Sequence, residues 1–413
     1  MKTSHVRSPW TAGSCLLLML LLVSVELKAA ETIKLGLTYP NTGRYKDLGI
    51  DQARGALLAI EEINRAGGLL NRKLELVVGS SGRQGKEKEQ IQELLKAGVS
   101  MAFGGSLNPV VTATTAARSN LLYVDTLFHS PADRISRPTV FYESYDSWMA
   151  AKTLAFYMNQ QLRNRRIFYV SSDSPWGEMT ESILRKFTNS ADKQEHGQSV
   201  TRFPSPRRKD FLSAYQQADA EGAQVLVLVQ YGDDLAKALQ VAHELGIKEN
   251  MQIVAPNLTL TVARSVGANV LQDVIGTVPW SWQVARDYSY AEGVRFTEAY
   301  VDQYQTKPSA AAASAYTTVM QYRHAVEQAG ELGAHTVAKQ LAGQTYSGPK
   351  DPQTWRESDH LSVQSVYVVK GKPRDQVIQG ELREDYFRVM SNIAGQIVAL
   401  TPQEVSEKAW EGI

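Results

Sequence analysis

The chain is almost devoid of cysteine, since the only one among its 413 residues is Cys15 near the N-terminus. If residues 1–30 are removed, no cysteine remains, which excludes disulfide bonds, thiolate catalysis and metal sites built on cysteine. An excess of charge is also lacking, because 44 Lys and Arg residues balance 43 Asp and Glu residues. This balance favours no polyanionic partner, and we expect no binding to nucleic acid.

The sequence also lacks the short motifs of common catalytic and cofactor sites. It contains no G-x-S-x-G, Walker A, H-E-x-x-H or EF-hand pattern, and its seven histidines do not pair at metal-ligand spacing. Asp125 and His129 form the one local pair with catalytic potential, but no nucleophile or metal ligand accompanies them. We therefore expect no enzyme activity, no catalytic residue, no metal and no cofactor.

Long apolar runs are missing except near the N-terminus, where residues 15–25 read CLLLMLLLVSV. Basic residues precede this run and small residues follow it, an order typical of a secretory signal peptide. A membrane-spanning helix needs roughly 20 apolar residues, more than this run provides. We predict that residues 1–30 are cleaved off and that the protein is exported to the periplasm. Cys15 lies within the apolar run rather than after it, so we do not expect a lipoprotein.

From residue 32 onward, apolar segments of strand length alternate with amphipathic segments of helix length. This alternation predicts parallel sheets that carry helices on both faces. The predicted strands cover residues 32–39, 73–79, 99–105, 121–126, 166–172, 198–203, 224–231, 251–256, 273–282 and 361–372. The predicted helices cover residues 47–68, 86–97, 147–161, 176–190, 209–220, 233–245, 290–305, 309–329 and 335–342, and a further helix begins at Pro109.

The alternation restarts after residues 135–148, ISRPTVFYESYDSW, which predicts two α/β domains with doubly wound parallel sheets. The first lobe is expected to hold residues 31–144 and about 281–347. The second lobe is expected to hold residues 145–280 and about 348–373. Residues 374–413 form a C-terminal extension to which the pattern assigns no place.

Several of these stretches resemble one family when they are taken in order. They are IKLGLTYPNTGRYKDLGIDQARGALLAIEEINRAGG, RPTVFYESYDSW, SSDSPWGE, VLVLVQYGDDLAKALQVAHELGI, KPSAAAASAYTTVMQYRHAVEQAG and DHLSVQSVYVVKGK. Over residues 32–372 the chain resembles type I periplasmic binding proteins, in particular the Leu/Ile/Val-binding and amide-binding group that serves ABC transporters. The resemblance implies two lobes joined by a hinge of three crossings and closing on a small-molecule ligand. It also implies docking to an ABC transporter permease in the inner membrane, and we expect a monomer.

The resemblance places ligand contacts of the first lobe in three loops. The matching positions are Tyr45, Ser106, Asn108, Phe128 and His129. Asn108 stands where the family has serine, and it equally suits the N-cap of the helix that follows. Phe128 and His129 replace small residues that hold an amino acid backbone in the family, which is a substantial departure.

The resemblance implies a second group of contacts in the other lobe and at the hinge. These residues are Trp176, Tyr231 and Asn257, with Trp280 and Trp282 near the second crossing. Asn257 stands near the place of the family's acidic partner for a ligand ammonium. Tyr45, Phe128, Trp176 and Tyr231 would form an aromatic cage, unless they pack in the core or the hinge. We therefore expect an aromatic, amide-like or otherwise less zwitterionic ligand rather than a plain branched-chain amino acid.

Three functions fit such a scaffold. The first is a binding protein that feeds an ABC importer, and the second is a periplasmic sensor that presents its bound state to a membrane receptor. The third is a periplasmic enzyme, for which Asp125 and His129 would be the local candidates. The sequence disfavours the enzyme and does not separate the importer from the sensor.

Overall fold

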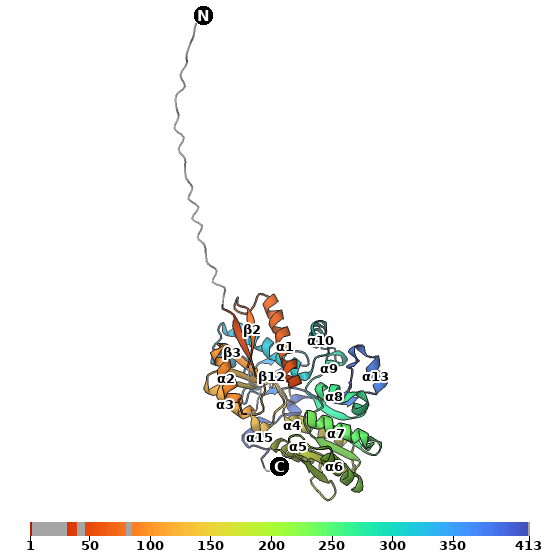
Figure 1. Cartoon of the computed structure of the whole chain (residues 1–413). Coiled ribbons are helices and arrows are strands. Elements are labelled where there is room, and N and C mark those ends of the chain that lie inside the picture. The colour runs from red at the N-terminus through yellow and green to blue at the C-terminus, as the bar shows by residue number, and fades with distance from the viewer. Residues whose placement is uncertain (2–30, 39–45, 80–84, 412–413) are drawn as a thin grey trace.

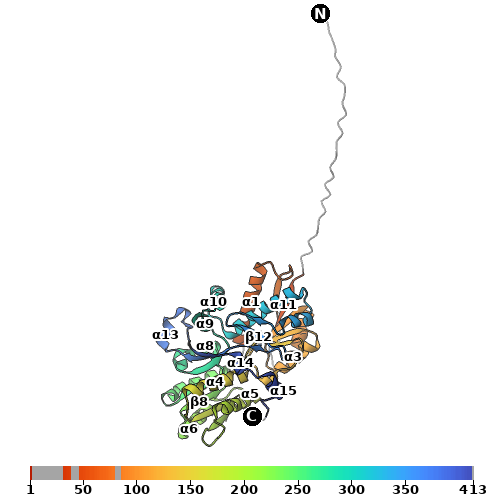
Figure 2. The same cartoon turned by 180° about the vertical axis from the view of Figure 1, so that it is seen from behind.

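The structure is a computed structural model that describes residues 1, 31–38, 46–79 and 85–411. It contains two βα lobes, seen in Figure 1 with α1, α2 and α3 in one lobe and α5, α6 and α7 in the other, and from behind in Figure 2. The predicted α/β class with two sheet-based lobes is therefore confirmed. Most of the predicted signal peptide and Tyr45 lie outside the described residues. Within the described residues, no helix has both the length and the apolar character needed to cross a membrane.

The first sheet has five strands in the order β2-β1-β3-β4-β5, and all of its neighbours pair in parallel. Its strands are β1 (Ile33–Thr38), β2 (Leu74–Val78), β3 (Val99–Gly104), β4 (Leu122–Asp125) and β5 (Val140–Tyr142). The helices of this lobe are α1 (Lys46–Arg65), α2 (Glu87–Lys96), α3 (Pro109–Arg118), α10 (Ala291–Tyr304), α11 (Ala310–Ala329) and α12 (Ala334–Leu341).

The second sheet has seven strands in the order β15-β14-β10-β9-β8-β6-β7. Its strands are β6 (Ile167–Ser172), β7 (Gln198–Thr201), β8 (Val225–Val229), β9 (Gln252–Ala255), β10 (Ile275–Val278), β14 (Val366–Gly371) and β15 (Phe387–Ile393). Strands β6 to β10 pair in parallel, whereas β14 and β15 join the edge in antiparallel fashion. Its helices are α4 (Ser147–Gln161), α5 (Pro175–Thr188), α6 (Arg208–Ala220), α7 (Asp233–Glu244), α8 (Leu260–Leu271), α9 (Trp282–Asp287), α13 (Arg374–Gln379), α14 (Gly395–Val398) and α15 (Pro402–Ser406).

Strand β8 illustrates why an uninterrupted apolar run forms a strand here. All five of its residues, VLVLV, are buried. Leu226 and Leu228 face one core of the second lobe, whereas Val225, Val227 and Val229 face the other. A central parallel strand covered by helices on both faces needs apolar side chains at every position, which explains the pattern.

Helices α1 and α11 pack closely against each other in the core of the first lobe, where both carry small residues. A Cβ atom added at Gly55 would lie only 2.1 Å from the carbonyl oxygen of Ala312, so glycine is required at this contact. The close packing fixes the N-terminal turn of α11 beside α1. This placement matters because both helix ends reach the space between the lobes.

The chain passes between the two sheets three times: after β5, after β10 and before β14. Residues 348–373, which the sequence places in the second lobe, are shared between the lobes. Trp355 packs in the first core beside a small sheet of β11 (Thr345–Tyr346), β12 (Gln353–Trp355) and β13 (Ser362–Val363). Strand β14 belongs to the second sheet, and the C-terminal extension completes that lobe by adding β15 and by packing α14 on α4.

Candidate functional site

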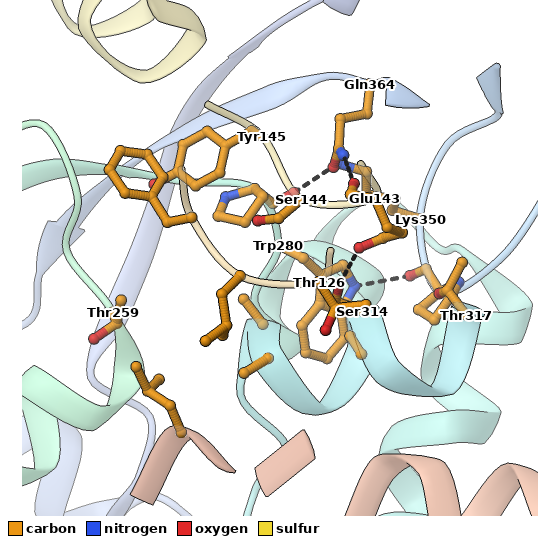
Figure 3. A pocket seen from close by; sticks show the side chains of 18 of the residues that line it. Thr126, Glu143, Ser144, Tyr145, Thr259, Trp280, Ser314, Thr317, Lys350 and Gln364 are labelled. Carbon is orange, nitrogen blue, oxygen red and sulfur yellow. Dashed lines mark hydrogen bonds between the residues drawn. The ribbon is translucent and has the colours of Figure 1, made fainter. Parts of the chain in front are cut away.

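A small cavity of about 60 Å³ lies between the two lobes, at the level of the crossings. Both lobes and all three crossings contribute to its wall, as Figure 3 shows for part of the lining. The first lobe supplies Leu48, Thr126, Leu127, Phe128, Ala310, Ala311, Ala313, Ser314 and Thr317. The second lobe supplies Tyr231, Asn257 and Thr259. The crossings and the segment between β11 and β12 supply Glu143, Ser144, Tyr145, Pro279, Trp280, Pro349, Lys350 and Gln364.

The position of the cavity follows from the topology of the sheets. Thr126 directly follows β4, and Tyr231 and Asn257 follow β8 and β9 by two residues each. These positions lie beyond the carboxyl ends of parallel strands, where open α/β sheets bind ligands. The two lobes point these ends at each other, so the loops close the cavity from both sides.

Four aromatic rings from different parts of the chain meet at one side of the cavity. The ring centroid of Phe128 lies 4.9 Å from that of Tyr145 and 6.0 Å from those of Trp176 and Tyr231. The rings of Phe128 and Tyr231 are almost parallel, at 10°, although they belong to opposite lobes. Phe128, Tyr145 and Tyr231 line the cavity, and Trp176 packs behind them. Three of the predicted cage residues are thus brought together, and Tyr145 joins them.

Asn257 lines the cavity and is buried, and its side chain has a partner inside the protein. The hydroxyl of Tyr145 donates to Oδ1 of Asn257 at 3.0 Å. The bond fixes Tyr145, which lies on the first crossing, against the second lobe. Asn257 therefore orients an aromatic wall of the cavity, and its role toward a ligand stays a prediction.

The opposite side of the cavity is polar, and all three crossings meet there. In Figure 3, Glu143, Ser314, Lys350 and Gln364 gather on this side, away from Tyr145 and Thr259. The hydroxyl of Ser314 donates to Oε2 of Glu143, and the amide nitrogen of Gln364 donates to the carbonyl oxygen of Glu143. A helix of the first lobe and the third crossing thus both bind the first crossing.

Lys350 ties the same crossings together through its ammonium group. Its Nζ atom donates to the carbonyl oxygen of Pro279 at 2.6 Å, to Oε1 of Gln364 at 2.8 Å and to the carbonyl oxygen of Ser365 at 2.8 Å. Burial lowers the pKa of Lys350 to about 8, although the charges of Asp351 and Glu143 oppose the shift. Three acceptors match the three protons of a lysine ammonium, so this buried group is fully satisfied as a cation.

Glu143 is the one acidic side chain among the described residues that line the cavity. Burial raises its pKa above the usual 4.5, although the hydrogen bond from Ser314 and the charge of Lys350 lower it. The sequence-based reasoning looked for an acidic group near Asn257 and did not consider the crossing. A charged residue within the apolar stretch TVFYESY was the signal that could have identified it.

His129 is buried, but it does not line the cavity in the described part of the chain. Its Nδ1 atom lies 3.2 Å from the carbonyl oxygen of Leu127, and its ring packs 5.0 Å from that of Tyr142. Burial lowers the pKa of His129, while the carboxylate of Asp146 opposes the shift. The residue supports the loop that carries Phe128, and a direct ligand contact stays a prediction.

Asp125 and His129 do not form a catalytic pair in the described structure. The carboxylate of Asp125 accepts a hydrogen bond from the backbone N–H of Leu127 at 3.0 Å, whereas His129 faces Asp146. Burial raises the pKa of Asp125 to about 7. The described residues also contain no cluster of three or more His, Cys, Asp or Glu side chains that could hold a metal ion.

Ser106 and Asn108 lie at the start of α3, outside the cavity lining. The side chain of Asn108 accepts a hydrogen bond from the N–H of Val111 at 3.3 Å, which makes it the N-cap of this helix. The hydroxyl of Ser106 accepts from that of Thr112 at 2.7 Å. Of the two readings that the sequence left open for Asn108, the structure supplies the cap, and its ligand contact stays a prediction.

Sequence-based reasoning missed most of the polar side of the cavity. Ser314 and Gln364 lie within stretches that carry the family resemblance, but neither was considered as a site residue. Lys350, in the segment SGPKDP, has no local signal because its partners are far apart in the sequence. Trp280 lines the cavity and donates to the carbonyl oxygen of Pro349 at 3.0 Å, whereas Trp282 does not line it.

A family model described as "Periplasmic binding protein" matches residues 32–376. Among curated proteins, the chain is similar to the leucine-, isoleucine-, valine-, threonine- and alanine-binding protein of Pseudomonas aeruginosa. The two are 22% identical over 340 residues, which cover 78% of this chain and 85% of the relative.

Two solved structures illustrate the likeness of the fold. An amino acid ABC transporter substrate-binding protein from Pseudomonas fluorescens Pf-5 has a TM-score of 0.78 at 21% identity, with 92% of this chain and 98% of that chain covered. A solute binding protein of an ABC transporter from Rhodopseudomonas palustris BisB5, in complex with 3,4-dihydroxy benzoic acid, has a TM-score of 0.74 at 16% identity, with 88% and 98% covered. At these identities the likeness establishes the fold and leaves the ligand open.

Proposed function

The chain belongs to the periplasmic binding protein family, and on that premise we propose that it captures a small solute between its lobes and delivers it to the permease of an ABC importer. The observation that carries the proposal is the cavity that both lobes and all three crossings enclose. A site divided between two lobes binds its ligand most tightly when they close, so binding is coupled to a change of shape. The permease would read this closed shape, with the protein acting as a monomer in the periplasm and without turnover.

We further propose that the ligand is aromatic, amide-like or otherwise different from a plain branched-chain amino acid. The aromatic side of the cavity, built on Phe128, Tyr145 and Tyr231, supports a flat or apolar ligand body. Asn257, at the place expected for an acidic partner of an ammonium group, is already hydrogen-bonded to Tyr145. A volume of about 60 Å³ suits a compact ligand, on the order of four water molecules in size.

A thermal-shift screen of residues 31–413 tests this proposal. The panel holds branched-chain amino acids, aromatic amino acids, aromatic acids, amides, polyamines and short alcohols. A ligand at 100 times its dissociation constant stabilises the folded state by about 2.7 kcal/mol, a shift of a few degrees. A thermal shift with aromatic or amide compounds, and none with leucine, supports both solute binding and the proposed ligand class. A clean leucine or valine response supports solute binding and contradicts the ligand class.

The importer role is tested in cells with the solute that the screen identifies. Deletion of the gene should abolish uptake of the labelled solute at concentrations near the dissociation constant, and the intact gene should restore it. If uptake persists while the response of the cell to the solute is lost, the protein is a sensor instead. If the purified protein converts the solute, it is an enzyme.

A further inference from the structure

The polar side of the cavity has an unequal supply of hydrogen-bond donors and acceptors. Lys350 directs its ammonium at Pro279, Gln364 and Ser365, so its protons are committed to the protein. Both polar atoms of the Gln364 amide are also engaged, since Nε2 donates to the carbonyl oxygen of Glu143 and Oε1 accepts from Lys350. The ammonium of Lys350 and the side-chain amide of Gln364 are therefore already in use.

Glu143 differs from these neighbours because only one of its two carboxylate oxygens accepts a hydrogen bond from the described residues. Its Oε2 atom accepts from the hydroxyl of Ser314, whereas Oε1 accepts no hydrogen bond from any of the described residues. The side chain is only 4% exposed and lines the cavity. A carboxylate offers about four lone-pair sites, so a buried carboxylate with one donor is far from satisfied. A donor group on a molecule in the cavity would satisfy this oxygen.

Lys350 balances the charge of Glu143 without bonding to it. Because its protons point to other acceptors, Lys350 contributes a positive charge nearby and no donor to the free oxygen. The charge of Lys350 favours the ionised form of Glu143 and so opposes the rise in its pKa that burial causes, and an ionised carboxylate only accepts hydrogen bonds. A ligand carboxylate at the same place would meet the like charge of Glu143, which is strongly unfavourable in a buried site.

We propose that Glu143 determines specificity by accepting a hydrogen bond from the ligand. The cavity then takes a compact, mainly apolar molecule whose polar end carries an N–H or O–H donor and no carboxylate. This proposal rests on the proposed function and specifies its ligand. The apolar body lies against Phe128, Tyr145 and Trp280, and the donor end lies between Glu143 and Ser314. A neutral amide, a neutral alcohol and an alkylammonium share this chemistry, while the matching acid lacks it.

The test is isothermal titration of residues 31–413 at pH 7.5 with two sets of shape-matched probes. One set is benzamide, benzyl alcohol, benzylamine and benzoate, and the other is propionamide, 1-propanol, propylamine and propionate. We expect a donor probe of at least one set to bind at least 100-fold more tightly than the acid of that set. Glu143→Gln should reduce this ratio to less than tenfold, with the larger loss for an ammonium than for an amide.

Glu178→Gln is the control, since it removes an exposed acid on α5 and should leave the ratio unchanged. If Glu143→Gln does not fold, the probe ratios of the unsubstituted protein decide the question alone. An acid that binds as tightly as its amide, alcohol and amine partners overturns the role of Glu143, as does leucine binding more tightly than every donor probe. Both of these results leave the proposal of solute binding intact. If neither these probes nor any compound of the screening panel binds, the proposed function is overturned as well.

Discussion

Arg264 on α8 and Asp51 on α1 form an ion pair across the mouth of the cleft, with 3.5 Å between Nη1 and Oδ2. The same guanidinium donates to Glu384 of the C-terminal extension at 2.9 Å and to the carbonyl oxygen of Lys307 at 2.6 Å. Glu384 in turn accepts from the backbone N–H of Lys307 at 2.7 Å. Arg264 and Glu384 belong to the second lobe, whereas Asp51 and Lys307 belong to the first, so this network holds the lobes together.

Replacement of Arg264 by Met should therefore favour an open form. Arg264 is about one-quarter exposed, so we expect a loss of about 1 kcal/mol of closure free energy, roughly a fivefold change in the ratio of closed to open protein. Residues 31–413 contain no cysteine, which allows spin labels at Leu57→Cys and Leu245→Cys, on exposed faces of opposite lobes. Arg264→Met should shift the measured distances between the labels toward longer values without ligand.

Arg208→Met is the matched control for this experiment. Arg208 pairs with Glu244 inside the second lobe, so its loss should not alter the distance between the lobes. Unchanged distances in both variants would mean that the network at the mouth does not contribute to closure. A shift in both variants would mean that the effect comes from the loss of positive charge and not from the contact.

Phe128→Ala should weaken ligand binding more than it weakens folding. Its ring is half-buried and stacks on Tyr231 of the opposite lobe, so the substitution removes a wall of the cavity and a contact between the lobes. Aromatic pairs contribute about 0.5–1.5 kcal/mol beyond their buried area, so the loss of this pair alone should lower affinity roughly 2- to 13-fold. Titration with the solute found in the screen measures this loss, and thermal unfolding measures stability. Leu107→Ala, which truncates an exposed side chain outside the cavity, should change neither.

The fold was largely predictable from the sequence because an apolar strand or an amphipathic helix produces a pattern that can be recognised within a short stretch of residues. Helix 147–161 was predicted with the bounds of α4, and most strands were predicted within one or two residues. Helix α8 was missed, and it contains Gly267 in a conformation with φ of 77°, which breaks the helical pattern. Strand β15 was also missed, because it lies at a sheet edge where every second residue is exposed, and so its sequence is not apolar enough to stand out.

The candidate site was predictable only in part, for a physical reason. Phe128, Tyr231 and Asn257 follow strands whose ends are recognisable, so the topology brings them together. Glu143, Lys350 and Gln364 come from crossings, where the partners of a side chain are set by how two lobes meet. Lys350 bonds to Pro279, which is 71 positions away in the sequence, and no local pattern encodes such a contact.

Asp125→Asn should change how stability depends on pH. Burial raises the pKa of Asp125 to about 7 in the folded state, from 3.8 for the ordinary carboxyl group. Between pH 3.8 and 7 the folded protein holds a proton that the unfolded chain has released, so this group lowers the free energy of unfolding as the pH rises. An asparagine side chain does not titrate. The free energy of unfolding of the variant should therefore rise relative to that of the unsubstituted protein as the pH increases over this range, by a few kcal/mol at about pH 8.

Urea unfolding at pH 4, 6 and 8 measures this difference. Asp210→Asn is a useful comparison, because the pKa of Asp210 is lowered by a hydrogen bond at the N-terminus of α6. Its carboxylate stabilises the folded state above pH 3.8, so its loss should cost stability at pH 6 and 8. If Asp125→Asn shows the same sign as Asp210→Asn, the carboxylate of Asp125 is ionised and stabilised in the folded protein, contrary to this prediction.

Lys350→Met should be among the most destabilising single substitutions in the hinge. The ammonium of Lys350 bonds to the second and third crossings at once, and its loss leaves two carbonyl oxygens, a buried amide oxygen and the charge of Glu143 without their partner. Breaking a buried network of this kind costs roughly 3–5 kcal/mol. Lys248→Met is the matched control, since Lys248 also donates to three carbonyl oxygens but is half-buried, so water can replace it at a cost of about 1 kcal/mol. If both variants lose the same free energy of unfolding, the prediction is wrong. The buried ammonium of Lys350 would then stabilise the crossings no more than the partly accessible Lys248 stabilises its own loop.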